Sequence, residues 1–181
     1  MEANEAHELQ EHAEHAAHSD SLRPVALTMT LLAVLVAVVT VQGHRTHTDA
    51  VLSQAKASDM WNEYQAKKIR AYNAGLATKL IKVLAVADKD EAQKDVKEWG
   101  DYQVKSADDQ EKEKKVAEGF QEKVELAEHR ANYFDLGEVL LEIGLVITSI
   151  TLLTKSRIYW YLGLGFSVIG VVATVMGLLL K

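Results

Sequence analysis

The 181-residue chain contains no cysteine, so it can form neither a disulfide framework nor a thiolate metal site, and it has no thiol nucleophile. Its formal net charge is −6, and residues 1–20 carry acids at positions 2, 5, 8, 11, 14 and 20 without any Lys or Arg. Over residues 44–131 bases are interleaved with acids instead of forming a basic cluster. We therefore expect no nucleic-acid partner.

Residues 1–22 form an acidic, His-rich tail that we expect to be partly helical or disordered. Histidines at positions 7, 12, 15 and 18 suggest metal ligands, but Glu8, Glu11 and Glu14 each precede a histidine by four residues. Such pairs stabilise a helix by a few tenths of a kcal/mol. A solvated or partner-binding amphipathic helix is therefore favoured over specific metal binding, and no metal ligand is assigned.

Three apolar runs indicate the fold class. Residues 25–41 and 158–180 carry no charge, and residues 133–154 are apolar apart from three carboxylates. About 20 residues cross the hydrocarbon core of a bilayer. The sequence thus predicts an all-α membrane protein with transmembrane helices at 23–43, 132–154 and 158–181 and a short basic loop at 155–157. The acidic leading segment and the lack of a small-residue cleavage site predict that the first helix stays as an anchor.

Residues 44–131 contain three glycines and no proline, which predicts a long antiparallel helical hairpin, or coiled coil, between the first and second spans. A turn is expected near residues 88–91, and a second break is considered at residues 106–110. The apolar stripe of the first arm comprises Leu52, Ala55, Trp61, Tyr64, Ile69, Tyr72, Leu76, Leu80, Val83 and Ala87. Its expected counterpart comprises Val96, Trp99, Tyr102 or Gln103, Ala107, Val116, Phe120, Val124, Ala127 and Ala131. Trp61 and Tyr64 are interpreted as coiled-coil core, not as a ligand site.

Small residues recur down all three spans at alternating spacings of four and three. Where lipid removes the hydrophobic drive for association, small residues allow helix backbones to approach closely. We therefore expect the spans to pack against one another or against a second copy. The candidate packing positions are Ala33, Ala37, Gly137, Gly144, Gly163, Gly170 and Gly177.

The second span has two unlike faces. At 100° per residue, Asp135, Glu138 and Glu142 lie together, on the side opposite Gly137 and Gly144. Charged side chains in membranes avoid lipid and face protein or water. A single three-helix chain would have difficulty covering both faces, so we expect a homo-oligomer in the lipid bilayer.

The topology suggests partners for these acids. The end of the first span and the end of the third lie on the same membrane face as the start of the second. The candidate charge partners of Asp135 and Glu138 are His44, Arg45, His47 and Lys181. Glu142 lies about 10.5 Å deeper than Asp135, at the level of residues 36–40 and Thr174, which include no cation. Its companions are expected on another subunit or in a water-filled lumen.

Three interpretations of the acids stay open. They are charge pairing between helices or subunits, a proton or ion pathway through an oligomer, and a metal site formed by His44, His47, Glu138 and Glu142. The first is favoured, because no metal-binding Glu-x-x-His pair lies within the spans. The sequence has no Ser-His-Asp set, phosphate loop or nucleotide fingerprint, so we expect no enzyme, no cofactor and no small-molecule substrate.

Membrane orientation follows from the short loops. Arg23 and the loop at 155–157 lie on one side, which the positive-inside rule assigns to the cytoplasm. The N-terminus would then be cytoplasmic and the hairpin periplasmic, in the inner membrane of a bacterium. Basic residues beside the other ends of the spans, such as Arg45 and Lys181, weaken this assignment.

Several stretches carry a family resemblance. Residues 43–70, "GHRTHTDAVLSQAKASDMWNEYQAKKIR", together with "FDLGEVLLEIGLVITSITLLT" and "WYLGLGFSVIGVVATVMGLL", resemble the bacterial membrane proteins of domain-of-unknown-function family 4337. The resemblance covers the spans and the start of the hairpin, roughly two-thirds of the chain. It implies a bacterial membrane protein with a coiled-coil insert and brings no catalytic or binding residues.

These observations favour a non-enzymatic, homo-oligomeric membrane scaffold with projecting hairpins, to which protein partners could bind through the tail or the hairpin. One alternative is an oligomeric ion or proton conductor with Glu142 facing the path. A second alternative is a metal or pH sensor that uses the N-terminal histidines.

Overall fold

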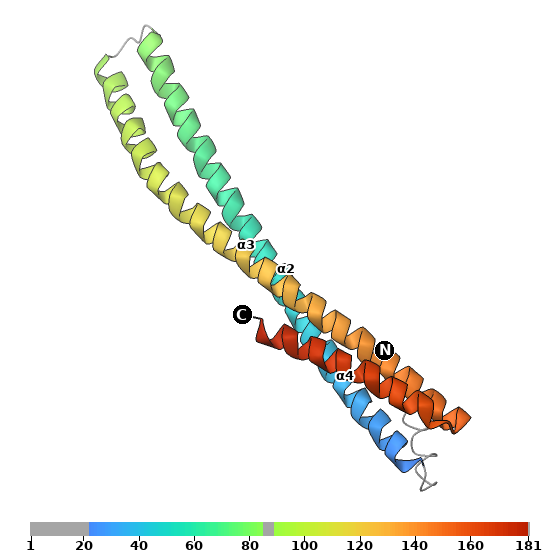
Figure 1. Cartoon of the computed structure of the whole chain (residues 1–181). Coiled ribbons are helices and arrows are strands. Elements are labelled where there is room, and N and C mark those ends of the chain that lie inside the picture. The colour runs from blue at the N-terminus through green and yellow to red at the C-terminus, as the bar shows by residue number, and fades with distance from the viewer. Residues whose placement is uncertain (1–21, 85–88, 181) are drawn as a thin grey trace. The chain divides into compact units, whose positions relative to one another are not determined.

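The computed structural model describes residues 22–84 and 89–180, and these residues form three helices without a strand (Figure 1). They are α2 (Arg23–Val83), α3 (Lys89–Thr154) and α4 (Arg157–Leu179). The predicted all-helical class is therefore confirmed. The chain divides into two compact units: unit 1 combines Met1–Asp49 with Leu126–Lys181, and unit 2 is Ala50–Glu125. The N-terminal tail and Lys181 lie outside the described residues.

The helix ends follow from local sequence. Pro24, the only proline of the chain, lies in the first turn of α2, where its missing N–H costs no intrahelical hydrogen bond. Asp90 and Glu91 lie in the first turn of α3 and match the positive end of its dipole. The turn predicted at 88–91 was placed too late, because Lys89 already begins α3. The break considered at 106–110 is absent, since α3 continues through it.

The helices also continue past the predicted span boundaries. α2 has no break near residue 43, and α3 has none near residue 131. The loop between α3 and α4 is shorter than predicted, because Arg157 is already helical. Lys155 turns the chain there with a φ of 54°, in the left-handed region. Ser156 then precedes α4 in an extended conformation.

In unit 1, α2 and α3 pack through large apolar side chains. The buried positions of α2 recur at spacings of four and three, which keeps them on one face of the helix. Trp160 of α4 packs against the same cluster, and its Nε1 donates a hydrogen bond of 3.3 Å to Thr28 Oγ1. The cluster contains Val25, Met29, Leu32, Val36, Val39, Phe134, Leu141 and Leu145.

α3 and α4 pack through glycine instead. A Cβ added to Gly144 would lie 2.8 Å from the carbonyl oxygen of Gly163, and one added to Gly163 would lie 2.7 Å from the carbonyl oxygen of Gly144. Gly137 and Gly170 show the same reciprocity, at 3.0 Å and 2.9 Å. The pairs run in opposite directions along the two helices, which are therefore antiparallel. Their backbones approach so closely that even a methyl group does not fit.

Hydroxyl groups at this interface are mostly satisfied within their own helices. Thr148 donates to the Gly144 carbonyl at 2.7 Å, and Ser167 donates to the Gly163 carbonyl at 2.8 Å. Each bond lets a buried hydroxyl face the neighbouring helix without an unpaired hydrogen. At the end of α4, Arg130 Nε donates to the carbonyl of Gly177 at 3.3 Å. That carbonyl belongs to the last turn, where backbone acceptors have no intrahelical donor.

Unit 2 is built from the second part of α2 and the first part of α3, and small side chains occupy its buried positions. Ala57, Ser106 and Ala117 are buried, as are Ala50 and Val124. Trp61 and Tyr64 are partly buried and pack edge to face, with ring centroids 5.7 Å apart. The α2–α3 interface thus resembles a small-residue contact more than a leucine-rich core.

The predicted core stripe of the first arm is wrong over much of its length. Seven of its residues are exposed, and Tyr102, Ala107 and Val116 of the second arm are exposed as well, while Ala87 lies outside the described residues. The physical reason is helix rotation: at 100° per residue, Leu76 lies about 180° from Lys67, the residue that contacts α3. The exposed residues of the first-arm stripe are Leu52, Ala55, Ile69, Tyr72, Leu76, Leu80 and Val83.

All three helices contain a segment long and apolar enough to cross a membrane, judged by length and composition. Large apolar side chains of these segments lie on the outside of unit 1. Examples from the three helices are Leu27, Val38, Leu136, Val146, Ile169 and Leu178. In water, such a surface would be a contiguous exposed apolar patch of the kind that marks an interaction with lipid or protein.

Candidate functional site

Asp135 and Glu138 of the second span face α2 within unit 1. His47 Nε2 lies 3.1 Å from both carboxylate oxygens of Asp135. The Thr40 hydroxyl donates to Glu138 Oε1 at 2.6 Å. Gly43 lies between these two α2 positions, and a Cβ added there would lie 3.6 Å from Asp135 Oδ1, an ordinary contact. One face of α2 therefore supplies polar partners for both carboxylates.

The other expected charge partners are not brought to these acids. Among the described residues, Arg45 forms no ion pair with Asp135 or Glu138, because it lies about 160° around α2 from His47. His44 and Arg45 instead line a shallow open pocket of about 400 Å³ with Val41, Thr48 and Asp49. Of the four expected partners, His47 thus lies beside Asp135, and Arg45 does not. Lys181 lies outside the described residues.

The second span has a glycine face and an acidic face, and other helices of the same chain contact both. Its glycine face packs on α4 through Gly137 and Gly144, while its acidic face meets Thr40 and His47 of α2. One chain therefore contacts both faces, although the Asp135 side chain stays 49% exposed. The two faces alone do not require a second subunit, and homo-oligomerisation stays a prediction.

The four residues of the metal-site interpretation are not brought together as a group. His47 lies on Asp135, and Glu138 accepts from Thr40, whereas His44 lines the open pocket. Within residues 22–84 and 89–180, no three His, Asp or Glu side chains are grouped so that they could hold a metal ion. Glu142 is partly buried one helical turn further along α3.

The small residues of the three spans differ in how far they are buried. Gly137, Gly144, Gly163, Gly170 and Gly177 are all buried. Their counterparts in the first span are not used in the same way, because Ala33 is only partly buried and Ala37 is exposed. Ala33 still packs against the apolar cluster of unit 1, so Ala37 is the exposed one of the two.

Unit 2 contains a partly buried charge pair. Lys67 Nζ donates to Glu113 Oε1 and lies 3.4 Å from Glu63 Oε1. The side chains of Lys67 and Glu113 are 25% and 15% exposed, so solvent screens them less than an open surface pair. The Glu113 hydrogen bond raises the pKa of Lys67 above its usual value of 10.5, with smaller support from the Glu63 carboxylate.

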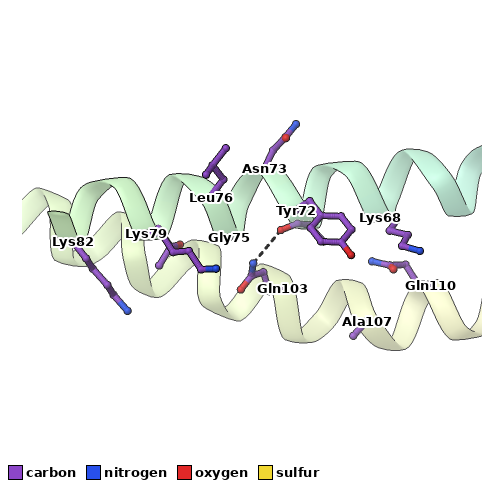
Figure 2. A pocket seen from close by; sticks show the side chains of 12 residues that line it. Lys68, Tyr72, Asn73, Gly75, Leu76, Lys79, Lys82, Gln103, Ala107 and Gln110 are labelled. Atoms are coloured by element: carbon purple, nitrogen blue, oxygen red, sulfur yellow. Dashed lines mark hydrogen bonds between the residues drawn. The ribbon is translucent and has the colours of Figure 1, made fainter. Parts of the chain in front are cut away.

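Next to this pair, α2 and α3 border a groove of about 790 Å³ (Figure 2). Gln103 and Gln110 point from α3 toward α2, and Gln103 Nε2 donates to the Ala71 carbonyl at 3.0 Å. Leu76 points away from α3. The groove has three lysines, Lys68, Lys79 and Lys82, and no acid in its lining.

Sequence reasoning missed this feature because charge was averaged over the whole arm. Between Glu63 and Asp88 the chain has no acid, while it carries Lys67, Lys68, Arg70, Lys79 and Lys82. A window of one or two helical turns would have shown a basic amphipathic helix there. Its apolar residues were noticed, but they were assigned to the core.

A comparison with protein-family models assigns the chain to a family. The family model described as "Domain of unknown function (DUF4337)" matches residues 21–180. The chain belongs to the DUF4337 family. The match includes the second arm of unit 2, so the family relationship extends further than the two-thirds of the chain expected from sequence alone. No curated protein and no solved structure matches the chain.

Proposed function

We propose that this DUF4337 protein is a non-enzymatic, homo-oligomeric membrane scaffold, with α4 and parts of α2 and α3 spanning the bilayer and unit 2 forming an antiparallel helical hairpin. The apolar exterior of unit 1 supports insertion, because lipid is the solvent in which exposed Leu, Val and Ile side chains carry no penalty. Ion conduction along Glu142 is the first alternative, and sensing by the tail histidines is the second.

The exposed Ala37 of α2, with the partly buried Ala33 beside it, carries the proposal of self-association. Ala33 and Ala37 are four residues apart, which is the spacing at which small residues allow two membrane helices to approach. The corresponding faces of α3 and α4 already pack on each other through Gly144 and Gly163. Pairing of α2 with α2 of a second copy would use the remaining face in the same manner.

Mass-resolved chromatography in a mild detergent tests this assembly. We expect the natural chain to elute as an oligomer and Ala37→Leu to shift toward the monomer, because a larger side chain separates the two backbones. Val38→Leu is the matched control, since Val38 is also exposed but lies about 100° away on α2. A natural chain that is strictly monomeric, or an Ala37→Leu variant with unchanged mass, would contradict the proposal.

We place the protein in the bacterial inner membrane with unit 2 in the periplasm, supported by the basic loop at Lys155 and Arg157. The chain has no cysteine, so Val104→Cys provides a single label site on an exposed position of unit 2. A membrane-impermeant maleimide added to intact spheroplasts is expected to label it fully. Labelling that occurs only after the membrane is opened would reverse the orientation.

A further inference from the structure

One face of α2 in unit 2 has an unusual combination of properties. Its outer stripe consists of Ile69, Tyr72, Leu76, Leu80 and Val83, all of them half-exposed or more. Leu76 is 58% exposed and Val83 is 84% exposed. The stripe lies about 180° from Lys67, which faces α3, so the α2–α3 contact cannot cover it.

Cations flank the outer stripe on both sides. Measured from Leu76 at 100° per residue, Lys79, Lys68 and Lys82 lie about 60°, 80° and 120° away on the side of the groove. Arg70 lies about 120° away on the other side. In the part of the chain that the structure describes, no carboxylate forms an ion pair with any of these four residues. Lys68 Nζ lies 5.7 Å from the centroid of the Tyr64 ring.

We propose that the outer stripe and its four cations bind the surface of a membrane rich in anionic lipid. An apolar stripe with basic flanks is the composition of helices that lie in the membrane interface, with apolar side chains among the acyl chains and cations at the headgroups. Lipid phosphates can meet Arg70 on one flank and the three lysines on the other at the same time. Lys68, Lys79 and Lys82 on the first flank also line the groove in Figure 2.

The charges favour an anionic membrane over two other occupants, a second copy of the chain and an acidic protein helix. A second copy that paired stripe to stripe would bring like charges together, which is unfavourable. An acidic protein helix in the groove would neutralise Lys68, Lys79 and Lys82 and leave Arg70 on the far flank. The stripe also protrudes instead of lining the groove, because only Tyr72 and Leu76 among its members reach the lining. The inference goes beyond the proposed scaffold and holds for any subunit number.

Vesicle flotation tests the proposal with the full chain reconstituted in phosphatidylcholine nanodiscs. Vesicles of phosphatidylcholine with about one-third phosphatidylglycerol should capture the nanodiscs, and pure phosphatidylcholine vesicles should not. Capture should fall as salt is raised, because salt screens exposed charges. Leu76→Glu with Leu80→Glu should weaken capture by about tenfold or more.

The control is Val104→Glu, a position on α3 of the same unit that is 77% exposed and lies outside the stripe. It should bind phosphatidylglycerol vesicles as the natural chain does, while replacing Lys68, Lys79 and Lys82 with Gln should weaken binding without loss of helicity. Equal capture by both vesicle types, or an unchanged Leu76→Glu/Leu80→Glu variant, would overturn the proposal.

Two further outcomes would show that the occupant of the stripe is not an anionic membrane. If an acidic helical peptide with leucine at heptad positions binds and phosphatidylglycerol vesicles do not, the occupant is a protein. If Leu76→Glu/Leu80→Glu instead lowers the subunit count of the nanodiscs, the occupant is a second copy. Because subunit count is measured separately from capture, failure of lipid binding and failure of assembly can be distinguished.

Discussion

Gly163→Ala should destabilise unit 1 by about 1–3 kcal/mol, the usual cost of forcing an extra carbon into a packed interface. The new Cβ would lie 2.7 Å from the Gly144 carbonyl oxygen and would overlap the Thr148 hydroxyl. The carbonyl is backbone and cannot rotate away, so α3 and α4 must separate. Titration with a denaturing detergent, followed by circular dichroism, measures the change in the free energy of unfolding.

Gly165→Ala provides the matched control on the same helix. A Cβ at Gly165 meets nothing within 4 Å, so the substitution should be neutral or should stabilise the helix by up to about 1 kcal/mol. Gly144→Ala should resemble Gly163→Ala, since its Cβ would lie 2.8 Å from the Gly163 carbonyl. Equal free energies of unfolding for Gly163→Ala and Gly165→Ala would show that the helices do not pack through these glycines.

Lys67→Met should destabilise unit 2 more than Glu113→Gln does. Loss of Lys67 leaves the largely buried Glu113 carboxylate without its cation, while loss of the Glu113 charge leaves Lys67 with Glu63 at 3.4 Å. The double variant Lys67→Met/Glu113→Met should recover much of the loss, because replacing both members of a buried pair removes the stranded charge. Thermal unfolding, followed by helicity of the full chain, gives the order of the midpoints.

The pH dependence of this pair has a defined sign. Because the folded-state pKa of Lys67 is raised, its contribution is complete below the usual value of 10.5 and is lost as pH rises through the raised pKa. The midpoints of the natural chain and Lys67→Met should therefore converge as pH rises from 10.5 through the raised pKa of Lys67. Lys112→Met is the control, since Lys112 pairs with Asp108 on an exposed surface. A constant gap at all pH values, or an equal loss for Lys112→Met, would contradict a partly buried pair.

Much of the architecture could be predicted from sequence because hydropathy and small-residue spacing act over many residues. The apolar runs mark the three helices, and the heptad spacing of Gly163, Gly170 and Gly177 marks the face that packs on α3. The rotation of α2 in unit 2 could not be predicted in this way. Apolar side chains such as Leu76 and Leu80 suggested a core, but the contact with α3 uses Ala57 and Lys67.

The contacts at the candidate sites also depend on helix rotation, which the sequence pattern did not predict. The topology of the spans predicted that Asp135 lies near the end of the first span. Whether His47 or Arg45 contacts it depends on the exact rotation of α2. The Thr40 bond to Glu138 was missed, because a hydroxyl was not considered as a partner for an intramembrane acid. The basic groove was missed because alternating charges elsewhere in the arms masked it in the average.

The central claim is that several copies of this chain assemble in the membrane. Counting subunits in nanodiscs excised directly from the native membrane, by photobleaching of one fluorophore per chain, tests it without detergent extraction. The account predicts two or more bleaching steps for the natural chain and for Val38→Leu, and a shift toward single steps for Ala37→Leu. Single steps for the natural chain at every expression level would contradict it.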